Sequence, residues 1–407
     1  MSNTTIGGAT ASPSQAAQFG AMASSGGSNF AAGAIPTDRL IRAEVALGIV
    51  REIVPPSEHI GLSQIAPFYD VPTDDVIFAY MNGSTTGLAP ARSEDAESEL
   101  FQQDDGFAGE GRASTIDWAI KSHYTASQIN RYREYVAMVE QMQQTGNVPL
   151  TIQSPLNQFQ EKLARDRVER RRRIDNRLEK LIIDSIADGE VGYSDGKTDF
   201  VVDWQRPSDQ HDQTPVSGTY ADTTHDPVND IIHVSDTMND IYGLRPKRMI
   251  APAKFLNTFF RSNKFVTAAG IKPGDGLDGS DLPYLWEGFG PQAALDLVKR
   301  VTGIEILPYD SVWRARGADG KLVANRYMDE DRVIFLPDES DIAEYDSSPI
   351  GFAKTLTSPH PMGNWTSGYY EFEYSTTDPW AHAVGDGIKA FPVFPHLELT
   401  YTWRVEY

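Results

Sequence analysis

The chain of 407 residues contains no cysteine. Disulfide bonds, thiol nucleophiles and cysteine-ligated metal or iron–sulfur sites are therefore excluded. Uncharged apolar runs of about 18 residues are also missing, so no segment is predicted to cross a membrane. The first residues lack the basic and apolar segments of a secretory signal peptide. These absences predict a non-membrane protein that holds its fold without covalent cross-links.

Positive charge is scarce, because 36 Lys and Arg stand against 57 Asp and Glu, a formal net charge of −21. Such a chain repels nucleic acids overall and favours basic partners or divalent cations. Residues 1–37 carry no charged side chain and consist mostly of Ala, Ser, Gly and Thr. This composition cannot bury enough apolar surface to fold alone. It predicts either a disordered tail or an arm that becomes ordered against a partner.

The next part of the chain begins with a helical pattern and then turns to strands and loops. Apolar residues recur at helical spacing over 36–54, whereas 60–124 has the pattern of strands and loops, with one strand in DVIFAYMNG (75–83). The acidic stretch 93–111 has no apolar periodicity. A segment of this length with so little core predicts a projecting loop or hairpin.

Two long helical tracts follow, at 117–142 and 156–189. The apolar side chains that share one face of the second tract are Leu156, Phe159, Leu163, Ile174, Leu178 and Leu181. In the middle of the tract, Arg167 and Arg170 occupy that face instead. The stripe is thus apolar at both ends and cationic in the middle, which is not the pattern of a simple core helix or a regular coiled coil.

Beyond residue 189 short helices and strands alternate. Strands are predicted at 198–204, 247–252, 304–310, 331–338 and 369–376, and helices at 226–243, 253–262 and 291–303. Asp226 and Pro227 suit the start of the first of these helices. Strict alternation of apolar and polar residues over 397–407 predicts a strand that, with 369–376, belongs to an antiparallel sheet buried on one face. The predicted fold class is α+β.

The motifs that could indicate enzyme chemistry lack the surrounding sequence that each of them requires. GDGLDG (274–279) matches the dinucleotide fingerprint, but no strand precedes it and no helix follows. GKT (196–198) lacks the glycine spacing of a P-loop. A loose His/Asp group comprises His211, Asp212, His225, Asp226 and His233, without the spacing of a metal site. We therefore predict no catalytic, cofactor-binding or metal-binding residue, and a metal-dependent hydrolase is kept only as an alternative of a different class.

The most unusual feature is RDRVERRRRID (165–175). Between 165 and 177 seven arginines stand against three acids, a local surplus of +4 in an acidic chain. Three interpretations are open: a solvated helix face, a nucleic-acid contact, or an interface in which arginines meet acidic patches of neighbouring copies. The candidate contact residues are Arg167, Arg170, Arg171, Arg172 and Arg173.

The order of these parts resembles the major capsid proteins of tailed bacteriophages, which have the Hong Kong 97-type fold, and the lambda-type capsid protein E family is the most similar. The resemblance is carried by 226–266, with D-P-x-x-D-I, a helix, G-x-x-P, an apolar strand and a helix rich in large apolar residues. GNWTSG (363–368) followed by the final strands is similar to the end of family sequences.

The resemblance implies a division into five parts. These are an N-terminal arm (1–57), an extended loop (58–125), a peripheral domain (126–228) with a spine helix (156–188), an axial domain (229–345), and a return to the peripheral domain with the C-terminal strands (346–407). We expect the arginines of the spine helix to contact acidic loops of adjacent copies.

The function implied by the resemblance is structural rather than enzymatic, without a cofactor. Copies would form pentamers and hexamers that close into an icosahedral head shell around double-stranded DNA, which they would contact non-specifically. The implied partners are a scaffolding protein, a portal and, in some phages, a decoration protein. The expected location is the virion, after assembly in the host cytoplasm. An encapsulin-type nanocompartment shell, which shares the fold, is the nearest alternative.

Overall fold

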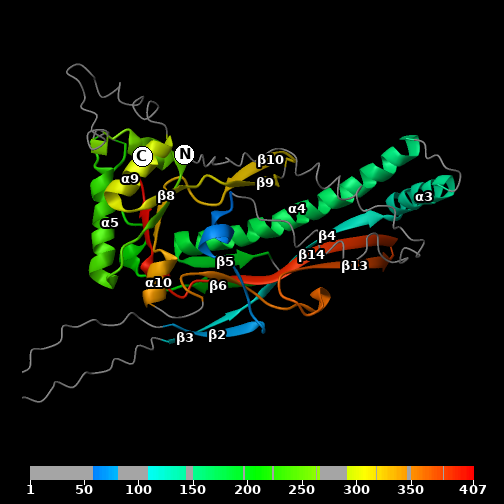
Figure 1. The fold of residues 1–407 in the computed structure, drawn as a ribbon, viewed down its shortest axis with the longest axis horizontal. Coiled ribbons are helices and arrows are strands. Elements are labelled where there is room, and N and C mark those ends of the chain that lie inside the picture. Colours follow the sequence, from blue (N-terminus) through cyan, green and yellow to red (C-terminus); the bar gives the residue numbers. More distant parts are fainter. Residues whose placement is uncertain are drawn as a thin grey trace, which may run out of the picture. The chain divides into compact units, whose positions relative to one another are not determined.

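A computed structural model of the chain describes residues 58–80, 109–143, 150–195, 198–221, 224–262, 264–265, 291–317, 319–345, 350–378 and 380–407. Helices and several separate sheets occur together, which confirms the α+β class (Figure 1). The predicted arm 1–57 with its helix at 36–54, and the GDGLDG motif, lie outside the described residues. Within the described ranges no helix has both the length and the apolar character that a bilayer crossing requires.

The chain divides into two compact units. The described part of unit 1 comes from Ile120–Arg171 and Glu371–Asp386, and unit 2 contains the other described residues. The elements that contribute to unit 1 are β4 (Ile116–Thr125), α3 (Ala126–Gln143), α4 (Leu150–Asp188), β13 (Tyr369–Thr377) and β14 (Trp380–Val393). Its apolar core contains Tyr124, Ile129, Leu163 and Val384.

Helix α4 confirms the longest predicted helix, although it begins at Leu150 rather than at residue 156. Its 39 residues give a length of about 58 Å at 1.5 Å per residue. The helix ends at Gly189, which has φ +76° and donates its N–H to the Ser185 carbonyl at 3.0 Å. Glycine adopts this left-handed conformation without a steric penalty, so it is a natural terminator.

The helix predicted over 117–142 is wrong in its first third. The chain forms strand β4 there, and α3 begins only at Ala126. Along β4 the more buried side chains alternate with exposed ones, and buried Trp118 donates its indole N–H to the Ala390 carbonyl at 2.9 Å. DWAIKSHYT therefore has the period of two of a strand, which the adjacent helical pattern concealed.

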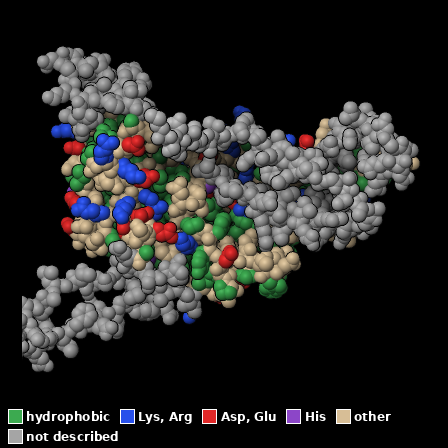
Figure 2. All heavy atoms as spheres, in the orientation of Figure 1, with side chains coloured by type: hydrophobic (Ala, Val, Ile, Leu, Met, Phe, Trp, Pro, Cys, Tyr) green, Lys and Arg blue, Asp and Glu red, His purple; other side chains and the backbone are tan. Residues whose placement is uncertain are grey.

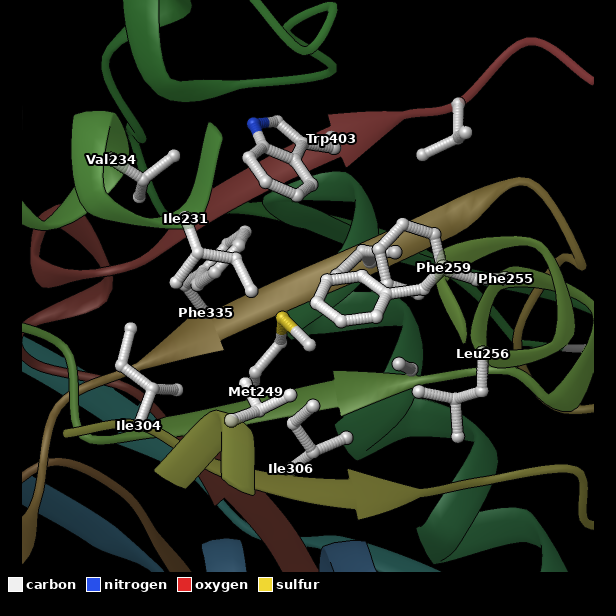
Figure 3. Close-up of a cluster of buried hydrophobic side chains, with 14 of the residues drawn as sticks. Ile231, Val234, Met249, Phe255, Leu256, Phe259, Ile304, Ile306, Phe335 and Trp403 are labelled. Carbon is white, nitrogen blue, oxygen red and sulfur yellow. The ribbon is translucent and has the colours of Figure 1, made fainter. Parts of the chain in front are cut away.

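One apolar core of unit 2 surrounds a four-stranded sheet in the order β15-β11-β7-β8. These strands are β15 (Tyr401–Arg404), β11 (Arg332–Leu336), β7 (Arg248–Ala251) and β8 (Glu305–Pro308), and the associated helices are α5 (Pro227–Tyr242), α6 (Ala253–Phe260) and α9 (Pro291–Thr302). Figure 3 shows Phe255 and Phe259 from α6 gathered with Phe335 and Trp403 from the strands. The predicted strands and helices of this region are thus confirmed.

A second sheet has the order β1-β12-β14-β13, and β4 also pairs with β14. Strand β1 is Phe68–Asp70 and β12 is Lys354–Thr357. Three two-stranded hairpins pair β2 (Asp75–Tyr80) with β3 (Gly109–Ser114), β5 (Glu190–Ser194) with β6 (Asp199–Asp203), and β9 (Val312–Arg316) with β10 (Leu322–Arg326), and a short helix α10 covers Glu339–Tyr345. Strands β2 and β3 pair antiparallel. Residues 93–108 of the stretch predicted as a projecting loop or hairpin (93–111) lie outside the described ranges.

The C-terminal prediction of one sheet buried on one face is wrong. Strand β15 covers only Tyr401–Arg404 and belongs to a different sheet from β13. Both faces of β15 are buried, because Thr402 and Trp403 are 0% and 1% exposed. The Thr402 hydroxyl accepts a hydrogen bond from the Asp212 N–H at 2.9 Å, so a polar side chain is accommodated inside.

Candidate functional site

The seven arginines of 165–177 lie on α4 and divide into an inner and an outer set. Arg167, Arg170 and Arg171 are only 2–3% exposed, and we call them the inner arginines. The exposed, outer arginines are Arg165, Arg172, Arg173 and Arg177. The predicted cationic interruption of the apolar stripe is confirmed, because Arg167 and Arg170 are as buried as Leu163 and Ile174 on either side.

Two inner arginines find carboxylates inside unit 1. The Arg167 guanidinium lies 2.6 Å from Glu371 Oε1 on β13. Arg170 forms an ion pair with Asp386 on β14 and donates to the Ser122 hydroxyl on β4 at 3.1 Å. The sequence suggested that these two arginines contact a neighbouring copy. In the structure each pairs with a carboxylate of its own chain.

Burial away from water has the largest effect on the pKa values of the carboxylates in these two ion pairs. Burial raises the pKa of Glu371 and of Asp386, and the arginines Arg167 and Arg170 oppose that shift by stabilising the charged carboxylates. Each buried charge therefore depends on its partner, and the pairs hold α4 against the β13–β14 strands.

A neighbouring hydrogen bond joins α4 to β4. The Tyr124 hydroxyl donates to Asp166 Oδ2 at 2.9 Å. Burial, and next the hydrogen bond to the carboxylate, raise the pKa of Tyr124 to about 12, so the phenol keeps its proton at neutral pH. In unit 1 the middle of α4 is thus attached to three strands by polar contacts.

The outer arginines remain candidates for contact with other molecules. Arg172 and Arg173 are exposed on the unit 2 part of α4. Arg177 lies over the ring of Tyr193, with 4.9 Å between the guanidinium carbon and the ring centroid, and so has a cation–π contact within the chain. Solvent reaches all four outer arginines, which makes them the members of the block best placed for an intermolecular ion pair.

A buried acid on the same helix was missed by the sequence analysis. Glu179 accepts hydrogen bonds from the N–H groups of Gly61 and Leu62 at 3.0 and 2.9 Å, and from the Tyr309 hydroxyl at 2.8 Å. Burial raises its pKa, and the two backbone donors oppose the shift. Glu179 thereby fastens the π-helical turn Gly61–Ile65 to α4. The only sequence signal was an acid beside the apolar stripe.

A second missed arrangement is a chain of hydrogen bonds across the β13–β14 hairpin. The Ser375 hydroxyl is 2.9 Å from His382 Nδ1, and His382 Nε2 pairs with Glu373. In a hydrolase triad the acid orients Nδ1 and the nucleophile faces Nε2, so the two ring nitrogens have exchanged roles here. The three side chains lie on adjacent strands, and their contacts cross-link the hairpin.

The members of the loose His/Asp group do not form one site, and each makes its own local contacts. His225 is buried with its ring 4.1 Å from the ring of Tyr220, whereas His233 is exposed. Asp226 caps α5 by accepting the Asn229 N–H at 3.2 Å. Among the described residues, no three His, Asp or Glu side chains form a group that could hold a metal ion.

Charges of both signs are intermixed on the face drawn in Figure 2 over α5 and α9. Contact with a nucleic-acid backbone is typically made by a continuous basic patch. The described residues on this face do not form such a patch.

Comparison with known families decides the identity. The model of the family described as phage major capsid protein E matches residues 47–345, more than half of the chain. The chain belongs to the phage major capsid protein E family. It is a structural protein rather than an enzyme, as predicted.

One solved structure of a capsid protein supports the capsid fold. A protein described as the capsid protein of an Escherichia coli CFT073 prophage has 13% sequence identity and a TM-score of 0.55, over 90% of this chain and 99% of that one. A phage-related protein from Bordetella bronchiseptica RB50 has 12% identity and a TM-score of 0.48, over 89% and 96%. Among curated proteins, none matches the chain. The predicted Hong Kong 97-type fold of this capsid protein is confirmed.

Proposed function

We propose that copies of this chain assemble as pentamers and hexamers into the icosahedral head shell of a tailed phage. The observation that carries the proposal is the capsid-family match over residues 47–345. A shell subunit needs extensive complementary surfaces and projecting segments rather than a catalytic pocket. The β2–β3 strand pair and the outer arginines are features of this kind.

The proposal keeps the division of the chain that the sequence suggested. Its parts are the N-terminal arm 1–57, the extended loop 58–125, the peripheral domain 126–228 with the spine helix 156–188, the axial domain 229–345 and the C-terminal return 346–407. In this division α4 is the spine helix, and its inner arginines hold it within the subunit.

Of the outer arginines, Arg165, Arg172 and Arg173 are the proposed contacts with neighbouring copies. A chain with a net charge of −21 presents many carboxylates to its neighbours. Arginine suits such a contact because its planar guanidinium can bind a carboxylate through two parallel hydrogen bonds. The sequence hypothesis is thereby retained for the exposed residues, Arg172 and Arg173, while Arg167, Arg170 and Arg171 act inside the subunit.

The wider proposal includes the phage partners. A scaffolding protein and a portal would take part in assembly in the host cytoplasm, and the finished shell would enclose double-stranded DNA in the virion, with a decoration protein as a further partner. Contacts with DNA would be non-specific, since the acidic chain as a whole repels phosphate. An encapsulin-type shell is the second candidate, and nuclease-protected DNA inside particles formed during infection would distinguish the two.

Expression of the full chain, followed by sedimentation velocity and negative-stain microscopy, tests the proposal. We expect closed particles of very high mass. A variant carrying Arg172→Glu and Arg173→Glu should form fewer particles, whereas the control with Arg172→Lys and Arg173→Lys keeps the charge and should assemble better. A stable monomer that binds stoichiometric metal through His211, His225 or His233 would overturn the shell function. Normal assembly of the Glu variant would refute only the role of the arginines.

A further inference from the structure

We propose that the loop 360–366 presents Trp365 and Met362 as a rigid knob by which one copy of the chain binds a second copy. This inference rests on the proposed shell function and names one of the surfaces through which that function would operate. No motif or family match assigns a role to either side chain.

The knob consists of two large apolar side chains in water. Trp365 is 72% exposed, the highest value among the large hydrophobic residues that the structure describes, and Met362 is 57% exposed. Tryptophan carries one of the largest apolar surfaces of any side chain, so leaving it in water forgoes a large hydrophobic stabilisation. Single exposed apolar residues are ordinary, and the backbone under Trp365 is what sets it apart.

The backbone at this position is left-handed. Asn364 and Trp365 have φ angles of +56° and +57°. Asparagine adopts this region readily, but a bulky aromatic residue there is an outlier, and glycine would adopt it without a steric penalty. The chain therefore carries a local strain at the very residue whose side chain is exposed.

Local contacts hold the loop in this strained form. The Trp365 N–H donates to the His360 carbonyl at 3.1 Å, and the Thr366 N–H donates to the Gly363 carbonyl at 3.2 Å. The His360 ring stacks on Tyr370 with 4.0 Å between centroids, and the Tyr370 hydroxyl donates to Asp117. The loop is thus built on an aromatic platform that is itself anchored in unit 2.

The strained backbone at Trp365 does not bury the Trp365 side chain within the subunit. Strain of this kind is often kept where a residue binds another molecule. Tryptophan is among the residues most enriched at the energetic centres of protein interfaces. Rigid presentation lowers the conformational entropy lost when a partner binds. The geometry of Trp365 has the properties of a preorganised binding element.

The chain itself carries a surface of matching chemistry on the β9–β10 hairpin. Register places six side chains on one face of that hairpin, and all six are exposed: Val312, Arg314, Arg316, Leu322, Ala324 and Arg326. Arg326 pairs with Asp310 and Glu330 of its own chain. Arg314 and Arg316, beside aliphatic side chains, offer an indole ring both cation–π and apolar contact. A knob and a different complementary face on every copy make a head-to-tail contact, which is the type that builds rings. We therefore assign the second copy's β9–β10 face as the surface that receives the knob.

Trp365→Ala and Trp365→Gly test the knob, with Val201→Ala as a control at a strand residue that is 69% exposed. The concentration at which shells first appear in sedimentation velocity should rise at least about tenfold for both Trp365 variants, the loss expected for a hot-spot residue, and stay unchanged for the control. Below that concentration, the thermal midpoint of the subunit should not fall for either variant, and the Gly variant should gain because glycine relieves the strain.

A fall in the midpoint of both variants would indicate packing within the subunit and overturn the knob. Assembly of Trp365→Ala at the wild-type concentration would also overturn it, and would leave Trp365 to a partner other than a second copy. Failure of the wild-type chain to form any shell would instead contradict the proposed function.

The absence of cysteine allows a direct test of the receiving face. Single-cysteine chains with Met362→Cys and with Leu322→Cys are mixed, assembled and oxidised. We expect a disulfide-linked dimer from the mixture in the particle fraction, and far less from either variant alone or from unassembled subunits. No dimer in well-formed mixed particles would overturn the assignment of the β9–β10 face.

Discussion

Arg170 and Arg172 lie two positions apart on α4, yet they are in opposite environments. Arg170 is 3% exposed and paired with Asp386, whereas Arg172 is exposed. A buried ion pair adds little net stability compared with apolar residues, but removing one partner strands the other charge in a region without water. An exposed arginine has no such dependence because water solvates its charge.

We therefore predict that Arg170→Met destabilises the subunit by about 3–5 kcal/mol, whereas Arg172→Met changes stability by no more than about 0.5 kcal/mol. Urea denaturation of unassembled chains, followed by circular dichroism, measures both. The double variant Arg170→Met with Asp386→Leu should recover most of the loss, because no lone charge remains. Equal stability of the two single variants would contradict the buried ion pair.

His59 supplies a prediction about pH. It is 4% exposed and makes an edge contact with the ring of Tyr327. Burial lowers the pKa of His59 from its usual 6.5; Asp175 and Glu58 oppose the shift, and Arg172 adds to it. Below the usual pKa the unfolded chain binds a proton that the folded chain resists, so stability is complete above about pH 6.5 and is lost as the pH falls.

The thermal midpoint of the unassembled subunit should therefore drop between pH 7.5 and pH 5.5 more steeply for wild type than for His59→Asn, which cannot titrate. Differential scanning calorimetry of both proteins at matched ionic strength gives the comparison. Parallel pH profiles would show that His59 does not contribute to the acid sensitivity.

At the scale of the element, α5 displays the physical signals that start and stop a helix. Asp226 accepts the Asn229 N–H, Pro227 follows with no N–H to satisfy, and Gly243 ends the helix at φ +70°. These signals act within a few residues, which is why the boundaries of α5 were predictable from 226–243 alone. Strand β4 lacked such a boundary, and its period of two merged with the helical pattern that follows.

Asp226→Ala should lower stability by about 1 kcal/mol, since the first turn of α5 loses a cap. Asp236→Ala on the same helix is the matched control: Asp236 lies 3.1 Å from Arg245 with both side chains more than half exposed, so its loss should be nearly neutral. Urea midpoints of the two variants measure the difference. An equal effect of both substitutions would argue against the cap.

At the scale of the whole molecule, the net charge of −21 opposes the association of copies. Electrostatic repulsion between subunits extends over about 30 Å at 0.01 M salt and about 8 Å at 0.15 M. The proposed ion pairs of the outer arginines would act at short range and would weaken less over this interval than the repulsion does.

The concentration at which shells appear should consequently fall as salt is raised from about 0.01 to 0.15 M. Light scattering and sedimentation across a salt series measure it. Arg172→Glu with Arg173→Glu adds negative charge and should steepen the dependence. A threshold that rises with salt would mean that attraction by the outer arginines dominates instead.

The sequence by itself determined the α+β class, the position of α4, the caps of α5 and the interruption of the apolar stripe by Arg167 and Arg170. Each of these depends on a pattern that repeats or ends within a few residues, and local sterics and hydrogen bonding suffice to produce it. The capsid resemblance could also be found from the sequence alone, because it depends on the order of such local patterns.

Only the tertiary structure decided which arginines are inside and what they contact. Glu371 and Asp386 follow Arg167 and Arg170 by about two hundred residues, and no local pattern links them. Tertiary packing also decided three other features. These are the placement of β13 and β15 in different sheets, the hydrogen bond from Gly61 to Glu179, and the left-handed backbone of Trp365. Burial and long-range pairing arise when distant segments pack together, and that packing assigned the inner arginines to the subunit and left the outer arginines exposed.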